Sequence, residues 1–319
     1  MSTHLTRDVL AERDQRLVAA LQYNGRISAE EASSVLGYST REVQRRLKAM
    51  TGSGAVRVVA RRTRGPHVGA TMLRVKVLRG KLDTITSALA RREDIPFVDV
   101  SASGDEISAV LLHTFEPRNR LIFQQLPATG AVTAVTAQTV LHVFCEASDW
   151  RLDVLTARER EMLARSPQPS APGRELDATD EDIVAALESD GRLSAAAVAD
   201  RTGHAESTVR RRMASLFSQG QVDTQVLVDP QRLGMDIDAN IWMEVPPDHL
   251  DATGRSLARH PAVHGALATT GRANLCVAVW FRDIGELYRF LTEDLSGRSI
   301  AGTDTVLVGQ WVKRAGIHR

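Results

Sequence analysis

A stretch of 43 residues occurs twice in the chain, and this repeat limits what the chain can fold into more than any other feature. Residues 14–56 and 180–222 align at a constant offset of 166 without a gap. The shared residues include Gly25-Arg26 and Arg45-Arg46, which return as Gly191-Arg192 and Arg211-Arg212. A period this long does not fit a solenoid, whose repeats span roughly 20–50 residues. The repeat therefore indicates that a whole structural module is duplicated.

Each copy begins with two short helical patterns. In the first copy, Leu17 and Leu21 lie one turn apart, and Gly25 is predicted to end the helix as its C′ residue. Ser28 and Glu31 have the spacing of a capping box, in which each side chain satisfies a backbone N–H of the other residue. This spacing predicts a second helix over residues 29–36.

A glycine turn and a third helix complete the module. Gly37 ends the second helix, and Ser39 with Glu42 is predicted to form another capping box that opens a helix ending near residue 50. Two helices joined by a tight turn give the helix-turn-helix pattern. The second copy keeps the glycines but has Ala197 and Ala205 in place of one residue of each box, so we expect weaker helix starts there.

The third helix of each copy is predicted to have one apolar face and one polar face. At 100° per residue, the branched and sulfur-containing side chains gather on one side and the long hydrogen-bond donors on the other. The predicted inner residues are Val43, Leu47 and Met50 in the first copy and Val209, Met213 and Leu216 in the second. The predicted outer residues are Arg41, Gln44, Arg45 and Lys48 in the first copy and Ser207, Arg210 and Arg211 in the second.

Long donors on the second helix of a helix-turn-helix pair are placed to enter the major groove of DNA, where they meet guanine edges and phosphates. The alternative is a solvated charged face, which the occurrence of the same layout twice disfavours. In the first copy, the segment RVVARRTR follows the third helix. It is predicted to be a strand and loop that could follow the phosphate backbone as a wing. The predicted DNA-binding residues are Ser39, Thr40, Arg41, Gln44, Arg45, Lys48, Arg57, Arg61, Arg62, Ser207, Thr208, Arg210 and Arg211.

The net charge of +1 hides a difference between the two copies. Residues 7–64 contain 12 Lys/Arg against 6 Asp/Glu, whereas the matched window 173–230 contains 6 against 11. The first copy should therefore attract a polyanion at long range, and the second should not. In the second copy, the segment after the third helix, QVDTQVLVDP, has no basic residue at all.

Composition favours a soluble intracellular protein. With 319 residues, of which 43% are apolar, the chain can form two to four small domains with real cores. Cys145 and Cys276 match no metal or redox spacing and are interpreted as reduced thiols of a cytosolic protein. The N-terminal residues lack an apolar signal region, and no apolar run is long enough to span a bilayer. We expect no metal site and no cofactor.

The rest of the chain predicts two βαββαβ units. One follows each helical module, and Gly104 and Gly271 occupy the same turn in the two units at an offset of 167. The segment SPQPSAPG, residues 166–173, is predicted to be a linker because it sustains neither helix nor sheet. The expected segments are a winged helix-turn-helix domain over 1–64, a sensing domain over 65–145, a connecting helix and linker over 146–178, a second winged helix-turn-helix domain over 179–231 and a second sensing domain over 232–319.

On these motifs the chain resembles the Lrp/AsnC family of transcription regulators. The resemblance rests on DGRLS at 190–194, STVRRR at 207–212, DPQRLG at 229–234 and NLCVAVW at 274–280, with NGRIS at 24–28 and GYSTREVQRRL at 37–47 in the first copy. It implies an α+β protein in which winged helix-turn-helix domains that bind double-stranded DNA alternate with ferredoxin-like βαββαβ domains. Those domains would sense a small-molecule effector, such as an amino acid or other metabolite, and drive homo-oligomerisation. Two copies in one chain could pair with each other as a built-in dimer.

The resemblance also implies an effector site at the turn between the second and third strands of each sensing domain. The first copy has Gly104-Asp105, which partly matches the acidic turn of the family. In the second copy Arg272 replaces the acid, so it either clamps a carboxylate or is a solvated turn residue. The predicted effector-binding residues are Gly104, Asp105, Gly271, Arg272 and Asn274.

Trp242 is predicted to lie on the open face of its sheet, because the other face of its strand is apolar and must meet the helices. A large aromatic side chain among polar ones suggests a protein interface. A tryptophan covered by a neighbouring loop is the equal alternative. The matching face of the first sensing domain carries Arg74 and Lys76, so we hypothesise that the two open faces pack against each other within or between chains.

The main alternative function is enzymatic. Sirohaem decarboxylases look similar to this family and have the same pair of domains without DNA binding. His113 and His142 on strands of the first sensing domain could serve such an enzyme. Isolated histidines on strands are more often structural, and the outer arginines of the third helices have no role in that alternative. We therefore predict a regulator rather than an enzyme.

Overall fold

The computed structural model describes residues 9–63, 69–78, 80–113, 120–126, 128–164, 176–314 and 317–318. These residues fold into two compact units. The helix-turn-helix unit comprises Met1–Gly65 with Arg151–Gly234, and the sheet unit comprises Pro66–Trp150 with Met235–Arg319. Each unit therefore combines one segment from each copy of the repeat. None of the helices in the described ranges is both long enough and apolar enough to cross a bilayer.

The first module contains the three predicted helices. Ser28 and Glu31 form the predicted capping box at the start of the second helix, and Gly37 ends it in the left-handed conformation with φ +70°. Ser39 accepts a hydrogen bond from the Glu42 N–H, but the Glu42 carboxylate binds two arginines instead of closing a second box. The helices are α1 (Glu12–Tyr23), α2 (Ala29–Leu36) and α3 (Thr40–Gly52).

The second module repeats this arrangement with weaker caps, as predicted. Ser194 caps its helix without a reciprocal acidic partner, and Ala205 provides no side-chain cap. The first helix of this module does have a capping box, formed by Asp177 and Asp180, which the sequence analysis did not identify. The helices are α6 (Ala178–Ser189), α7 (Ala195–Thr202) and α8 (Glu206–Ser218).

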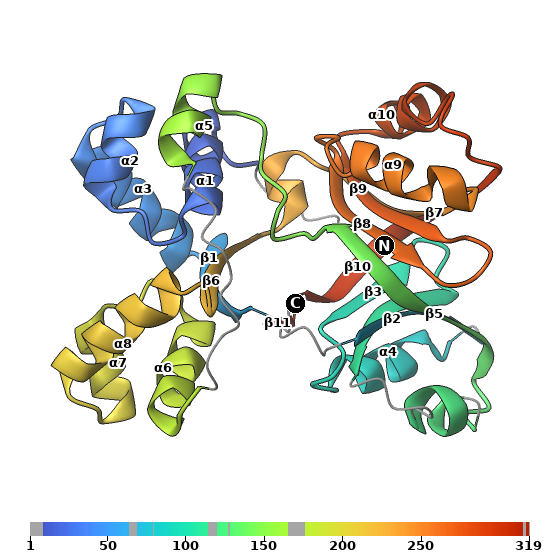
Figure 1. Cartoon of the computed structure of the whole chain (residues 1–319), viewed down its shortest axis with the longest axis horizontal. Helices are drawn as coiled ribbons and strands as arrows, with labels where there is room; N and C mark the ends of the chain where they lie inside the picture. The colour runs from blue at the N-terminus through green and yellow to red at the C-terminus, as the bar shows by residue number, and fades with distance from the viewer. Residues whose placement is uncertain are drawn as a thin grey trace. The chain divides into compact units, whose positions relative to one another are not determined.

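The strands that follow the third helices pair with each other and do not form separate wings. β1 (Val56–Arg62) and β6 (Val222–Val228) form an antiparallel two-stranded ribbon, with Val56 opposite Val228 and Arg62 opposite Val222. Figure 1 shows this ribbon between the two groups of helices. The predicted strand is confirmed, but alternating apolar residues do not identify its partner, which here is the equivalent strand of the other copy.

Each module packs against the other module's strand. Helix α1 contacts β6, and helix α6 contacts β1. Ala60 of β1 belongs to the apolar core that α6, α7 and α8 form. The two modules therefore share their cores across the ribbon and form one unit.

A further helix, α5 (Ala157–Leu163), also belongs to the helix-turn-helix unit. This is the expected connecting helix, and Thr156 and Glu159 form a capping box at its start. The Glu159 carboxylate accepts a hydrogen bond of 2.5 Å from Arg16 of α1, which ties the connecting segment to the first module. A short 3₁₀ turn (Pro230–Leu233) follows β6. The predicted linker at 166–173 lies outside the described residues.

The sheet unit contains the predicted order of elements twice. Each half has a strand, a helix, a hairpin of two strands, a second helical segment and a long strand. The first half consists of β2 (Gly69–Val77), α4 (Leu82–Ala90), β3 (Phe97–Ser101), β4 (Glu106–His113), the π-helical turn η1 (Leu121–Gln125) and β5 (Val132–Cys145). The second half consists of β7 (Ile237–Glu244), α9 (Pro247–Leu257), β8 (Val263–Thr269), β9 (Leu275–Phe281), α10 (Ile284–Arg289), η3 (Phe290–Asp294), β10 (Gly302–Arg314) and the short β11 (Ile317–His318).

The two halves form one closed β barrel, which corrects the prediction of two separate sensing domains. Within the halves the strand orders are β5-β2-β4-β3 and β10-β7-β9-β8. The β5–β8 and β10–β3 pairings then join the halves edge to edge. Sequence patterns give the strands of each half but do not show that the edge strands find partners in the other half.

The barrel has apolar cores on its outer side and a mixed polar interior. Helices α4, α9 and α10 pack on the outside (Figure 1). The interior contains Trp242, which is 1% exposed and packs with Met72 of the first half and with Cys276. The predicted open face around Trp242 is therefore closed, since it meets the corresponding face of the first half within the same chain. Burial raises the pKa of the Cys276 thiol to about 12.

Arg74 meets Trp242 inside the barrel, as the hypothesis of complementary faces required. Its guanidinium carbon lies 5.6 Å from the centre of the Trp242 ring. Arg74 also donates to Glu106 of its own half at 2.7 Å and to Asp304 of the other half at 2.8 Å. The pairing of the two halves is thus supported by a cation–π contact and an ion pair as well as by backbone hydrogen bonds.

A second polar cluster, which is half-buried, lies where β10 meets β3. Arg314 hydrogen bonds to Asp238 and, at 3.4 Å, to Asp99 of the other half. Burial raises the pKa of Asp99 to about 6, with the neighbouring Asp238 adding to the rise. Burial alone would also raise the pKa of Asp238, but Arg314 and His264 lower it to about 2. His264 stacks on Trp280 with ring centres 3.8 Å apart, and its burial lowers its pKa.

We expect Asp99→Asn to remove a pH-dependent part of the stability. As the pH falls through about 6, the folded protein takes up a proton at Asp99 that the unfolded chain takes up only near the ordinary value of 3.8. The free energy of unfolding therefore rises as the pH falls, by about 2 kcal/mol between pH 7.5 and 4.5. His264 acts in the opposite direction because its pKa is lowered, but both proteins contain it.

The measurement is thermal unfolding of the wild type and Asp99→Asn across this pH range. The wild type should gain unfolding temperature relative to the variant as the pH falls. A difference between the two proteins that stays constant with pH would contradict the assignment.

Candidate nucleic-acid interface

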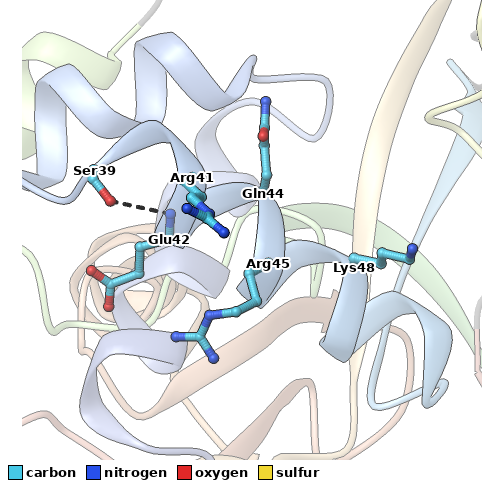
Figure 2. Close-up of a pocket in the computed structure, with 6 residues that line it drawn as sticks. All are labelled: Ser39, Arg41, Glu42, Gln44, Arg45 and Lys48. Atoms are coloured by element: carbon cyan, nitrogen blue, oxygen red, sulfur yellow. Dashed lines mark hydrogen bonds between the residues drawn. The ribbon is translucent and has the colours of Figure 1, made fainter.

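Helix α3 separates its apolar and polar side chains as predicted. Val43, Leu47 and Met50 are buried, and they fix which side of the helix faces the core. Arg41, Gln44, Arg45 and Lys48 are exposed and, with Ser39 and Glu42, line a hollow in the surface. Figure 2 shows these side chains projecting from successive turns of α3. Among the described residues, none forms an ion pair with Arg41, Arg45 or Lys48, so their charges are available to a polyanion.

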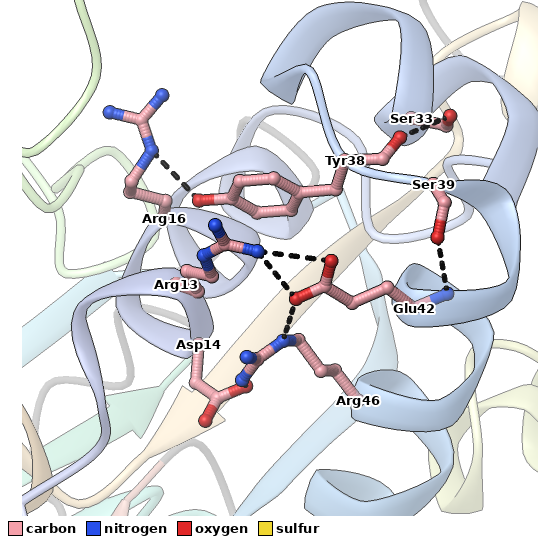
Figure 3. Close-up of polar contacts among 8 residues, drawn as sticks. All are labelled: Arg13, Asp14, Arg16, Ser33, Tyr38, Ser39, Glu42 and Arg46. Atoms are coloured by element: carbon pink, nitrogen blue, oxygen red, sulfur yellow. Dashed lines mark hydrogen bonds and ion pairs between the residues drawn. The ribbon is translucent and has the colours of Figure 1, made fainter.

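A network of arginines holds α3 against α1 (Figure 3). Arg46, on the flank of α3, donates to Asp14 of α1 at 2.8 Å and to Glu42 at 2.9 Å. Arg13 also donates to Glu42 at 2.9 Å. These two arginines, Arg13 first, lower the pKa of Glu42. The one acidic group beside the hollow is therefore compensated by two cations, and it orients α3.

The same anchor exists in the second module. Arg212 donates to Asp177 at 2.5 Å and to Asp180 at 3.1 Å. Arg46 and Arg212 are equivalent at the repeat offset of 166, as are Asp14 and Asp180. An arginine that ties the third helix to the first is thus a structural part of each module. The recurrence of Arg46 as Arg212 is visible in the sequence, but the role of this arginine follows only from its contacts in the structure.

Helix α8 exposes fewer available donors than α3. Val209, Met213 and Leu216 are buried, and Ser207, Arg210 and Arg211 are exposed, as predicted. Arg210, however, forms an ion pair with Glu206 one turn earlier on the same helix. Thr40 of α3 and Thr208 of α8 are half-buried near the helix starts. The two third helices therefore share a layout but differ in electrostatic potential.

A pair of equivalent arginines connects the two modules across the ribbon. Arg26 donates to the Gly191 carbonyl at 2.5 Å and to the Leu193 carbonyl at 2.9 Å. Arg192 donates to the Gly25 carbonyl at 2.5 Å and to the Ile27 carbonyl at 3.1 Å. Each arginine thus binds the carbonyls on either side of the other arginine. We call this reciprocal contact of Arg26 and Arg192 the arginine clasp.

The clasp depends on two glycines that allow close packing. A Cβ atom on Gly191 would lie 2.8 Å from the Val59 carbonyl carbon, and one on Gly25 would lie 2.6 Å from the Thr224 hydroxyl. Gly25 follows the C-cap Asn24 and so occupies the predicted C′ position, but its φ is not positive. Asn24 is the C-cap of α1, and Gly25 is needed where the loop meets the ribbon.

The basic residues of β1 lie on the ribbon rather than on a wing. Arg57 is exposed opposite Leu227, and Arg61 is half-buried opposite Asp223. Arg62 forms ion pairs with Glu181 at 2.6 Å and Glu188 at 2.9 Å, both on α6. Arg62 therefore neutralises acidic groups of the second module. Arg64, which the sequence analysis placed in the wing, lies outside the described residues.

The predicted effector residues occupy two turns of the sheet unit. Asp105 is exposed in the turn between β3 and β4, where Ser103 donates to its carboxylate at 2.5 Å and lowers its pKa. Gly104 precedes it with φ +73°. Within the described residues, no three His, Cys, Asp or Glu side chains gather in an arrangement that could hold a metal ion.

The second turn is fastened by side chains. Gln138 of β5 donates to the Thr270 and Ala273 carbonyls at 2.7 and 2.8 Å, and it leaves no room for a Cβ on Gly271. Arg272 is highly exposed and donates to Glu244 at 2.8 Å. The side-chain amide of Asn274 accepts a hydrogen bond from the Val245 N–H and donates one to the Val245 carbonyl. This turn therefore has fewer groups available to a ligand than the sequence suggested.

The comparisons with known proteins divide along the repeat. The AsnC-type helix-turn-helix domain matches residues 12–51 and 176–216, and the Lrp/AsnC ligand binding domain matches residues 238–316. An uncharacterized HTH-type transcriptional regulator of Pyrococcus horikoshii, PH0140, is 31% identical over 147 residues, which is 46% of this chain and 92% of that protein. The HTH-type transcriptional regulator FL11 of the same organism is 30% identical over 136 residues, 42% of this chain and 89% of that protein. Each relative thus corresponds to one copy of the duplicated unit.

A solved structure matches both copies at once. The siroheme decarboxylase NirDL, in complex with an iron-uroporphyrin III analogue, aligns over 95% of this chain and 93% of its own with a TM-score of 0.60. The two sequences are only 14% identical, so this likeness concerns the fold.

We expect Gly191→Ala to destabilise the helix-turn-helix unit by about 1–3 kcal/mol, because the added methyl meets backbone atoms that cannot move aside easily. Gly52→Ala is the matched control, since its Cβ would have no neighbour within 4 Å and the residue has no positive φ. Urea unfolding followed by circular dichroism measures both. Equal stability of the two variants would show that the clasp region tolerates expansion.

Proposed function

The chain belongs to the Lrp/AsnC family of HTH-type transcriptional regulators, and we propose that it binds double-stranded DNA chiefly through helix α3. The observation that supports this best is the outer face of α3. Arg41, Arg45 and Lys48 are exposed there without an ion-pair partner among the described residues, and Gln44 lies between them. A helix of this kind fits the major groove, where arginine pairs with guanine and glutamine with adenine.

The proposed contacts follow from where each side chain lies. Arg41, Gln44 and Arg45 face base edges or phosphates, and Lys48 and the ribbon residues Arg57 and Arg61 face phosphates. The hydroxyl groups of Ser39, Thr40, Ser207 and Thr208 lie near the starts of the two helices, where they can meet phosphates. Arg62 would reach DNA only by breaking its ion pairs with Glu181 and Glu188, so we propose no contact for it.

Helix α8 is proposed to contribute less than α3. Its exposed Arg211 corresponds to Arg45, but Arg210 is held by Glu206. The window around α8 also has five more acidic than basic residues (6 against 11), which repels phosphates at long range. The first module therefore supplies most of the affinity, and the second adds a weaker contact.

We propose that the barrel consists of two ferredoxin-like halves and binds the effector. The strand orders β5-β2-β4-β3 and β10-β7-β9-β8 support that description of the halves. Of the two predicted turns, the one with Asp105 is better suited to a ligand, because its carboxylate is exposed and able to meet a cationic group. The protein would have one state that binds DNA and one that does not. An effector that binds one of them more tightly would shift the equilibrium toward that state.

The homo-oligomer predicted from the sequence stays a prediction. Both pairing surfaces of the repeat, the β1–β6 ribbon and the barrel edges, join residues of one chain.

The enzymatic alternative has weaker support than the regulator. Its basis is the fold shared with NirDL. His142 is exposed and packs edge-on against Phe144 with ring centres 4.7 Å apart, and His113 hydrogen bonds to Thr71 at 2.9 Å. Absorbance titration of the purified protein with an iron tetrapyrrole, followed by product analysis, tests this alternative. Stoichiometric binding with loss of carboxyl groups would establish an enzyme.

We expect Arg45→Ala to weaken DNA binding by roughly 1–3 kcal/mol, because it removes a donor able to read a guanine. The equivalent change Arg211→Ala should cost clearly less. Fluorescence anisotropy at one fixed salt concentration, on a duplex recovered by genomic footprinting of the purified protein, compares the two variants. Equal losses would contradict the proposed difference between the modules.

Lys48→Ala should weaken binding to all DNA sequences alike, because a phosphate contact carries no base information. The slope of log K against log salt concentration should decrease in magnitude by about one. Arg289→Ala removes one exposed charge in the sheet unit and serves as the control. If both variants change the slope equally, Lys48 makes no direct phosphate contact.

A further inference from the structure

The two third helices present different chemical groups at equivalent positions. At the offset of 166, the outer residues of α3 and α8 agree only at Arg45 and Arg211. The other equivalent pairs are Thr40 with Glu206, Arg41 with Ser207, Gln44 with Arg210 and Lys48 with Ala214. Glu206, Ser207, Arg210 and Ala214 are all exposed on α8. The differences therefore lie on the surface that meets DNA and leave the core unaffected.

Two of these differences, Arg41 with Ser207 and Gln44 with Arg210, change which bases each helix can recognise. In the major groove glutamine pairs with adenine, arginine with guanine, and a carboxylate accepts from the amino group of cytosine. Helix α3 offers glutamine at the position where α8 offers an arginine bound to Glu206. Base sequences that suit one helix are thus poor partners for the other.

The ribbon relates the two helices by a local two-fold axis. Val59 pairs with Gln225, and these residues are also equivalent in the repeat, since 59 and 225 differ by 166. The axis therefore passes through this pair. The arginine clasp obeys the same symmetry, because Arg26 binds the carbonyls beside Arg192 and Arg192 binds those beside Arg26. Helices α3 and α8 are thus held in opposite directions, as in a symmetric dimer.

We propose that a single chain reads one DNA site made of two unlike half-sites in inverted orientation and in a fixed order. The α3 half-site and the α8 half-site share the base read by Arg45 and Arg211 and differ at the neighbouring positions. A dimer with identical recognition helices binds a palindromic site. This chain instead requires an asymmetric site, in which the two half-sites differ and their order is fixed. The inference rests on the proposed function, since it specifies the DNA that α3 and α8 would bind.

The first experiment selects binding sites for the full-length protein from a random duplex library. The expected result is a motif of two unlike half-sites at one constant spacing. A perfect inverted repeat would overturn the proposal, and so would a motif with a single half-site, because α8 would then read nothing. Failure to enrich any sequence, with no salt-dependent retention of DNA, would instead refute the proposed function.

The second experiment makes the exposed face of α8 resemble that of α3. The variant carries Glu206→Thr, Ser207→Arg, Arg210→Gln and Ala214→Lys, all at exposed positions. It should select an inverted repeat of the α3 half-site and bind that repeat roughly tenfold or more tightly than the wild type does, since even one mismatched base pair costs about that much. An unchanged motif would overturn the proposal.

Two controls keep the result interpretable. Thermal unfolding of the variant should match that of the wild type, because the changed side chains are outside the core. The equivalent variant with Thr40→Glu, Arg41→Ser, Gln44→Arg and Lys48→Ala on α3 should select an inverted repeat of the α8 half-site. If it kept the wild-type motif, sequence recognition would not depend on these helix faces and the proposal would fail.

Discussion

The pairing of β1 with β6 is the interaction on which the helix-turn-helix unit depends. Val56, Val58 and Val59 of β1 are buried. Without β6 these side chains and one row of backbone hydrogen-bonding groups would meet water. Pairing with β6 covers these side chains and gives the backbone groups hydrogen-bond partners. Ala60 also packs into the core of the second module. Each module is therefore completed by its own repeat.

Duplication within one chain separates residues that must stay alike from residues that are free to differ. The anchors Arg46 and Arg212 occur at equivalent positions because each ties a third helix to a first helix. The clasp arginines Arg26 and Arg192 are equivalent because each binds the loop of the other module. The outer residues of α3 and α8 hold nothing in place and have diverged. In a homodimer a substitution on the third helix appears twice, whereas here it changes one half of the surface alone.

Local signals in the sequence predicted the elements well and their partners poorly. The box of Ser28 with Glu31, the turn at Gly37 and the inner residues of α3 follow from spacings of three or four residues, and the structure contains all of them. The partner of β1 and the close packing at Gly25 depend on contacts between residues more than 100 positions apart. The contact of Trp242 with Arg74 was anticipated, because the matching polar faces of the two halves suggested it. The equal offset of Gly25-Arg26 and Gly191-Arg192 was a usable signal, because surface loops rarely need to repeat an arginine next to a glycine. How DNA and effector contact the predicted residues depends on partners that one chain's sequence does not contain.

The two seams of the barrel, the β5–β8 and β10–β3 pairings that join its halves, also contain different residues. Where β5 meets β8, Gln138 fastens the turn after β8 through two backbone carbonyls. Where β10 meets β3, Arg314 instead binds the carboxylates of Asp99 and Asp238. In a symmetric dimer the two seams would be identical, and both would respond to pH or neither would. Here only the Arg314 seam, among those described, has a carboxyl group whose pKa of about 6 lies near neutrality. The two seams are therefore held by different chemistry, an arginine shared by two carboxylates at one and a neutral amide at the other.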